Sequence, residues 1–226
     1  MKLYLLDFKN IRFHFWIPIV SAWIFIPLAV FICQRITPTD NLTDASGFIQ
    51  MFHPFMAIWW IVFVFRQYAD ESGSELLHMY RRSQLPHCVF MQLFFLLITG
   101  VPYGILSCFY PDTGLEFLRI AVESFCLSSA AYCIIFTFRS ATAAILVNLI
   151  YVAATWFVEF DISRMIDNPE NLLVKYDLLS YLNIFSIWVD ISEIPKMKFG
   201  VTAAIGFVFL MIGGWKNHNL FKNGRG

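Results

Sequence analysis

Four polar or ionisable residues lie within or at the ends of long apolar stretches, where such side chains are costly and often functional. Each is a candidate for lining a transport pathway, and each except Glu159 also has a purely structural explanation. Glu123 could pair with Arg119, one helical turn away. His53 precedes Pro54 and could simply fill a kink, and Asn148 could join two helices by hydrogen bonding. The four candidates are His53, Glu123, Asn148 and Glu159.

A second group of polar residues is concentrated in the segment 66–87, between two apolar stretches. Ser72 to Glu75 form a capping box, in which the first serine and the glutamate satisfy backbone amides at a helix start. Acidic residues precede or open this helix, and Arg81 and Arg82 end it, so the charges complement the helix dipole. Its apolar side chains are Leu76, Leu77 and Tyr80. The pattern predicts a short, deliberately capped amphipathic helix over residues 70–82.

No residue pattern indicates catalysis or metal binding. The five cysteines have no CxxC spacing and lie in or beside apolar runs, where a cysteine behaves as a small hydrophobic residue. The five histidines are scattered, and the intramembrane protease and alcohol-phosphotransferase patterns are missing. The chain also lacks the glycine-rich phosphate loop that binds ATP. We therefore expect no catalytic residue, no metal and no cofactor on this chain.

The composition requires a membrane around these residues. Of 226 residues, 58% are hydrophobic and 14% are charged, whereas soluble domains carry about a quarter charged residues. A soluble fold of this length could not bury so much apolar surface. The net charge of zero gives no reason to expect nucleic-acid binding.

Six apolar stretches are long enough, or nearly so, to span a bilayer, which takes about 20 residues. Because the apolar runs do not alternate with polar residues, they predict helices rather than a barrel. Pro18, Pro27 and Pro102 should kink their helices without breaking them. The expected fold is therefore an all-α integral membrane protein with a single transmembrane domain over 1–226. The predicted spans are 13–33, 47–65, 88–110, 115–138, 142–160 and 199–215.

Basic residues mark the cytoplasmic side of these spans. They precede the first span, lie between the second and third and between the fourth and fifth, and follow the sixth. Both termini are thus expected in the cytoplasm. Residues 1–15 suit an amphipathic helix on the inner membrane surface. On the outer side, Asn168, Pro169 and Glu170 form a helix start, which predicts short outer-face helices over about 168–194.

The capped segment resembles the coupling helix in permease subunits of type-2 ABC exporters. In that family an acidic residue is followed by Gly-Thr or Gly-Ser, then Glu, a leucine pair and basic residues. The six spans, internal termini, amphipathic N-terminal helix and outer-face helices also match that family. Its usual Leu-Pro after the glycine is replaced here by Tyr80-Arg81-Arg82. The matching residues are Glu71, Gly73, Ser74, Glu75, Leu76, Leu77, Arg81 and Arg82.

The resemblance implies that transport and ATP hydrolysis are carried out by different subunits. This chain would be the permease, with the coupling helix docked on a separate ABC ATP-binding subunit present in two copies, which holds ATP and Mg²⁺. It further implies a bacterial cell membrane and a second permease copy or a related permease. Small residues at every fourth place are candidate contacts between the two copies: Ser140, Ala144 and Asn148. Gly200 and Ala204 have the same spacing.

The expected substrate is amphipathic and taken from the membrane, such as a lipid, a drug or an antimicrobial peptide. Two other classes of function remain as alternatives. An intramembrane enzyme would need clustered catalytic residues at membrane depth. A substrate-binding membrane subunit of an importer, or a secondary carrier, would need no capped cytoplasmic helix and would often show inverted repeats.

Overall fold

The protein is all-helical throughout the residues that the computed structural model describes, which are 11–36, 42–69, 84–111, 113–157 and 196–223. This agrees with the predicted fold class. The helices are η1 (Arg12–Phe15), α2 (Trp16–Val20), η2 (Ser21–Phe25), α3 (Ile26–Ile36), α4 (Thr43–Ala69), α6 (Leu85–Leu106), α7 (Thr113–Phe138), α8 (Ala141–Phe157) and α10 (Lys196–Asn223).

Five helices are long and apolar enough to cross a membrane, so the chain is a multi-pass membrane protein. They are Phe13–Ile36, Ala45–Arg66, Leu85–Leu106, Thr113–Phe138 and Met197–Asn219. The span predicted over 142–160 corresponds to α8, which has 17 residues and a shorter apolar part, Ala141–Ala154. The six-span layout therefore stays a prediction. The helices predicted over 70–82, 168–194 and at the N-terminus fall wholly or largely outside the described residues.

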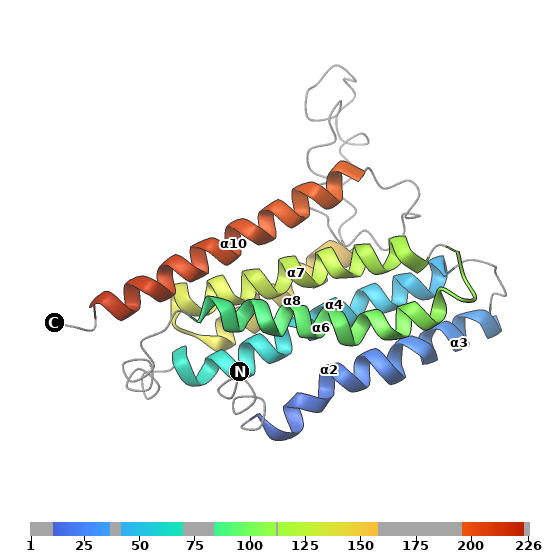
Figure 1. Cartoon of the computed structure of the whole chain (residues 1–226), viewed down its shortest axis with the longest axis horizontal. Helices are drawn as coiled ribbons and strands as arrows, with labels where there is room; N and C mark the ends of the chain where they lie inside the picture. The colour runs from blue at the N-terminus through green and yellow to red at the C-terminus, as the bar shows by residue number, and fades with distance from the viewer. Residues whose placement is uncertain (1–10, 37–41, 70–83, 112, 158–195, 224–226) are drawn as a thin grey trace, which may run out of the picture.

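The helices run up and down the long axis of the molecule (Figure 1). The end of α4, the start of α6, the α7–α8 connection and the end of α10 lie together at the left of that view. Arg66, Arg139 and Lys216 mark this end, which we call the basic end. The bias is incomplete, since Arg35 and Lys198 belong to the opposite end, where α3 ends and α10 begins.

The first spanning helix is built from four consecutive helical segments, because its prolines remove backbone donors. η2 is a π-helical turn at Ser21–Phe25, which ends two residues before Pro27. Since Pro27 has no N–H to offer the carbonyl four residues earlier, a wider turn accommodates the gap. The π segment thus lies next to the place where a kink is predicted at Pro27. In α4 and α6 the helix continues through Pro54 and Pro102.

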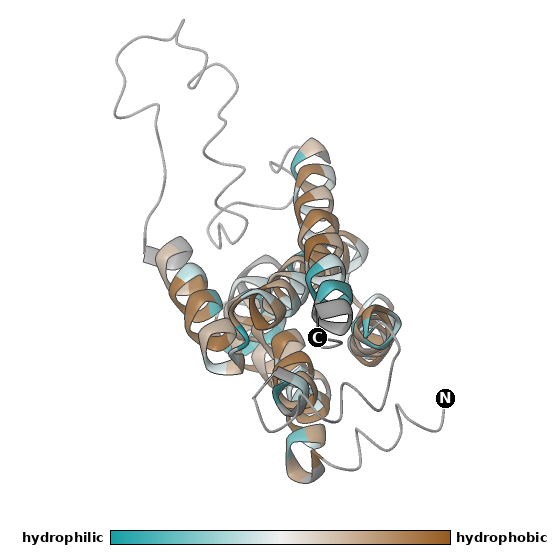
Figure 2. Ribbon diagram, turned by 90° about the vertical axis from the view of Figure 1, so that its left-hand side faces the viewer, coloured by the Kyte–Doolittle hydropathy of each residue, from teal (hydrophilic) through white to brown (hydrophobic). Residues whose placement is uncertain are grey.

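α7 is the central helix of the bundle. Within its span, 67% of the residues are buried inside the chain, against 33% for the first helix. It packs most extensively on α10 and α4. Towards the basic end an aromatic cluster fills the core, with Phe65 of α4 against Tyr132 and Phe136 of α7. The helices consist largely of hydrophobic residues (Figure 2). Many large apolar side chains are exposed on the outside of the described bundle, as expected for contact with lipid.

Candidate functional site

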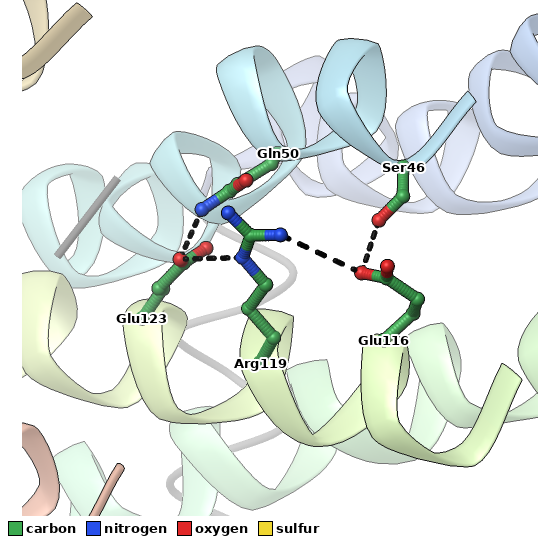
Figure 3. A network of polar contacts seen from close by, with 5 residues as sticks. All are labelled: Ser46, Gln50, Glu116, Arg119 and Glu123. Carbon is green, nitrogen blue, oxygen red and sulfur yellow. Dashed lines mark hydrogen bonds and ion pairs between the residues drawn. The ribbon is translucent and has the colours of Figure 1, made fainter. Parts of the chain in front are cut away.

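A buried network of charged and polar side chains joins α4 to α7 near the end opposite the basic end (Figure 3). Arg119 lies between two carboxylates of its own helix: its Nη1 is 3.9 Å from Glu116 Oε2, and its Nε is 3.6 Å from Glu123 Oε1. From α4, Ser46 Oγ donates a hydrogen bond to Glu116 Oε2, and Gln50 Nε2 donates one to Glu123 Oε1. We call these five residues the α4–α7 network.

Helical spacing brings the network together. Glu116, Arg119 and Glu123 are three and four residues apart, so their side chains lie along one face of α7. Ser46 and Gln50, four residues apart, face them from α4. Glu116 also lies in the first turn of α7, where the helix dipole favours a negative charge. None of the five side chains is more than 3% exposed, so the pairing offsets the cost of removing the charges from water.

The network is not fully satisfied. Within the described part of the chain, Gln50 Oε1 and Glu123 Oε2 are buried without a hydrogen-bond partner. The same holds for the Tyr103 hydroxyl of α6 and for Ser124 Oγ of α7. Tyr103 lies within electrostatic reach of the α7 charges. Buried acceptors of this kind are normally occupied by water or by a donor from a ligand.

A second basic residue lies near the network. Lys198, at the start of α10, is 9% exposed and interacts electrostatically with Glu123. Among the described residues, two carboxyl groups of α7 therefore lie near two basic groups, one from α7 and one from α10. Such an arrangement suits the alignment of helices better than the capture of a cation. Among the described residues, no three His, Cys, Asp or Glu side chains gather in a way that could hold a metal ion.

His53 forms a second polar bridge deeper in the bundle. Its Nδ1 is 2.9 Å from Ser21 Oγ in the π segment, and its Nε2 is 2.9 Å from Thr99 Oγ1 of α6. The ring stacks on Phe95, with centroids 5.1 Å apart. His53 is fully buried. Rather than only filling the kink before Pro54, it ties the first helix, α4 and α6 together.

The predicted site residues divide into three groups. Glu123 forms the predicted pair with Arg119, and whether it also lines a pathway stays a prediction. Asn148 is 3% exposed and donates from Nδ2 to the Ala144 carbonyl of its own helix, so this bond does not join two helices. Glu159 and the coupling-helix residues lie outside the described residues: Glu71, Gly73, Ser74, Glu75, Leu76, Leu77, Tyr80, Arg81 and Arg82.

Two of the residues predicted to join two permease copies, Ala144 and Asn148, are buried within the single chain, and the contact between copies stays a prediction. They are 0% and 3% exposed within the single chain, so their face of α8 packs inside the bundle. Ser140 accepts a hydrogen bond at Oγ from the Ala143 amide, as a residue capping the start of α8 does. The small residues of α8 thus serve packing within one chain.

Several residues of the network were not predicted. Glu116 falls inside the predicted span 115–138 but was not among the predicted site residues; it is 1% exposed in the first turn of α7. Its spacing from Arg119 and Glu123 is the signal that could have identified it. Ser46 and Gln50 give no such signal, because uncharged polar residues occur often in membrane helices. Gln92 of α6 was also missed; its Nε2 donates to Ser128 at 2.9 Å and Ser129 at 3.0 Å on α7.

Comparison with known proteins adds no assignment to this geometry. Neither a protein-family model, nor a curated protein, nor a solved structure matches this chain.

Proposed function

We propose that this chain is the membrane-spanning permease subunit of an ATP-driven exporter whose ATPase is a separate polypeptide. The observation that supports it most is the arrangement of α4 and α6. Both helices reach the basic end of the bundle, one ending and the other starting there. By the positive-inside rule that end faces the cytoplasm, where the capped segment 70–82 would meet an ATP-binding subunit.

Coupling would then work by mechanical transmission. Leu76, Leu77 and Tyr80 would be buried against the ATPase, with Glu75 and Arg81 in the polar rim. Closure of two ATP-binding subunits around ATP would shift this segment as a rigid handle. α4, a continuous helix of 27 residues, would carry the shift to the far end of the bundle. ATP and Mg²⁺ would remain on the partner throughout.

The substrate class follows from the same picture. An amphipathic molecule such as a lipid, a drug or an antimicrobial peptide would enter from the membrane. A bundle of about six helices is too small to enclose such a molecule alone, which favours a pair of permease copies. The residues that join the two copies would lie on lipid-exposed faces. Gly200 and Ala204 of α10 are both exposed, unlike Ala144 and Asn148.

The proposal predicts that charge or shape changes in the capped segment uncouple the complex. Leu77→Asp and Glu75→Arg should each abolish stimulation of the co-purified ATPase and lower export at least tenfold, because both disrupt the docking surface. Membrane insertion should stay normal. The measurement is ATP hydrolysis and export by the full complex purified from its source and reconstituted in vesicles.

Ser107→Asp is the matched control, since it places the same charge on an exposed residue at the opposite end of α6. It should leave hydrolysis and export unchanged. Unchanged export in both the Leu77 and the Glu75 variants would exclude the coupling role of residues 70–82.

A further inference from the structure

The α4–α7 network distributes its charges unevenly between the two helices. All three charged side chains of the network, Glu116, Arg119 and Glu123, belong to α7, and Arg119 pairs with carboxylates three and four residues away. Among the described side chains, α4 contributes the uncharged Ser46 and Gln50. Both of these ion pairs lie within α7, whereas the hydrogen bonds from Ser46 and Gln50 cross from α4.

This division has a mechanical consequence. Breaking a buried ion pair by withdrawing one partner leaves an uncompensated charge and is strongly unfavourable. If α4 moved away from α7 at this end, Arg119 would remain paired with both carboxylates. Among the described polar contacts across the interface, the hydrogen bonds from Ser46 and Gln50 would be lost, and water could replace them. The contact can thus open without stranding a charge in the membrane.

Two further observations favour opening at this place. Gln50 Oε1 and Glu123 Oε2, one on each side of the contact, are buried and lack hydrogen-bond partners among the described residues. Opening would give both acceptors access to water, which offsets part of the cost. At the other end of α4, by contrast, Phe65 packs tightly against Tyr132 and Phe136. At the network's own end, Ala45 and Ile49 of α4 share a smaller, aliphatic cluster with Ile120 of α7. The two ends of the α4–α7 interface therefore differ in the kind of side chains that separation would part.

We propose that the Ser46–Glu116 and Gln50–Glu123 hydrogen bonds form a releasable joint between α4 and α7, which closes the end of the bundle opposite the basic end. That the joint is driven from residues 70–82 rests on the proposed function. The existence of the joint does not rest on the proposed function, because it is inferred from contacts within the single chain. Ser46 and Gln50 are positioning residues in this scheme, and substrate need not touch them.

A cation-binding site is the main alternative use of these residues, and the charges argue against it. Glu116 and Glu123 already face Arg119, and Lys198 of α10 interacts with Glu123. An additional cation would lie close to both of these basic groups in a low-dielectric setting, where like charges repel strongly. The unpartnered oxygens are better matched to neutral donors such as water.

The joint is tested by measuring the distance between α4 and α7 on the purified full chain in lipid nanodiscs. Spin labels are attached through Phe48→Cys and Leu118→Cys, two lipid-facing positions that are 56% and 45% exposed. The exposed Cys108 is replaced by serine. The four buried cysteines stay, and their failure to react is checked on a chain without the two labelling sites. Pulsed electron–electron double resonance then gives the distribution of distances between the two spin labels.

Gln50→Leu should increase the population at longer distance roughly tenfold, which corresponds to about 1.4 kcal/mol. The matched control is Gln92→Leu, which removes a buried glutamine that bonds α6 to α7. It should leave the α4–α7 distances unchanged. Ser46→Ala, a smaller change, should also increase the population at longer distance. It replaces Gln50→Leu as the test if the Gln50 variant does not fold.

Two results would overturn the joint: distributions identical to the unmodified chain in every foldable α4 variant, or equal broadening by Gln92→Leu. Because no ATPase is present, neither result bears on the proposed function. Conversely, if the joint is found but the chain is not coupled to an ATPase, only the claim that residues 70–82 drive the joint is refuted.

Discussion

Replacing Arg119 with methionine is expected to lower the free energy of unfolding by about 3–5 kcal/mol, the cost of leaving buried charge without its partner. Arg119 is 3% exposed and is the one network cation between Glu116 and Glu123. Its loss would leave two carboxylates on one face of α7 at membrane depth. Unfolding in mixed micelles, followed by tryptophan fluorescence, measures the change.

A rescue variant and a surface control make this result specific. Arg119→Met combined with Glu123→Gln removes one of the two stranded charges and should recover a large part of the lost stability. Arg35→Met alters an exposed arginine that lies over the Phe31 ring, 5.3 Å from its centroid. It should change stability by less than about 1 kcal/mol. Equal effects of Arg119→Met and Arg35→Met would contradict the structural role of the network.

Gly213→Ala is expected to destabilise the protein by about 1–3 kcal/mol, or more, through overpacking of the α7–α10 contact. A Cβ at Gly213 would lie 2.5 Å from Tyr132 Cδ1 and 3.0 Å from the Cys133 Cα. The backbone of α7 cannot withdraw as a flexible side chain can. The hydrogen bond between Asn217 Nδ2 and the Tyr132 hydroxyl, at 3.3 Å, should weaken as the helices separate. Thermal unfolding in nanodiscs reports the change.

Gly200→Ala is the control on the same helix, because a Cβ there would meet nothing within 4 Å. It should be neutral or slightly stabilising, since alanine has the higher helix propensity. If Gly200→Ala lowered the stability as much as Gly213→Ala, the loss would not arise from the close approach of α10 to α7, and the prediction would be wrong.

The parts of the fold that depend on local properties could be predicted from the sequence. Apolar runs of sufficient length, such as that in α7, predict spanning helices because lipid leaves the backbone no alternative. The i, i+4 spacing of Arg119 and Glu123 likewise predicts an ion pair within one helix. Neither inference requires knowing which helices are neighbours.

What depends on helix–helix packing could not be predicted. The stripe containing Ala144 and Asn148 is as compatible with a second copy as with the inside of its own bundle, and packing selected the latter. The small residues that bring α10 close to α7 are Gly206 and Gly213, seven apart, whereas the predicted pair Gly200 and Ala204 faces outward. Spacing identifies a close-packing face but not its partner.

The proposed function requires the basic end of the bundle to face the cell interior, and a sidedness measurement tests this most directly. Ser74→Cys introduces a thiol into the capped segment. The native, exposed Cys108 follows the end of α6 at Leu106, whereas α6 starts at the basic end. With a membrane-impermeant maleimide, intact cells should label Cys108 only. The thiol at position 74 should react after the membrane is permeabilised. Labelling of position 74 in intact cells, with Cys108 protected, would contradict the account.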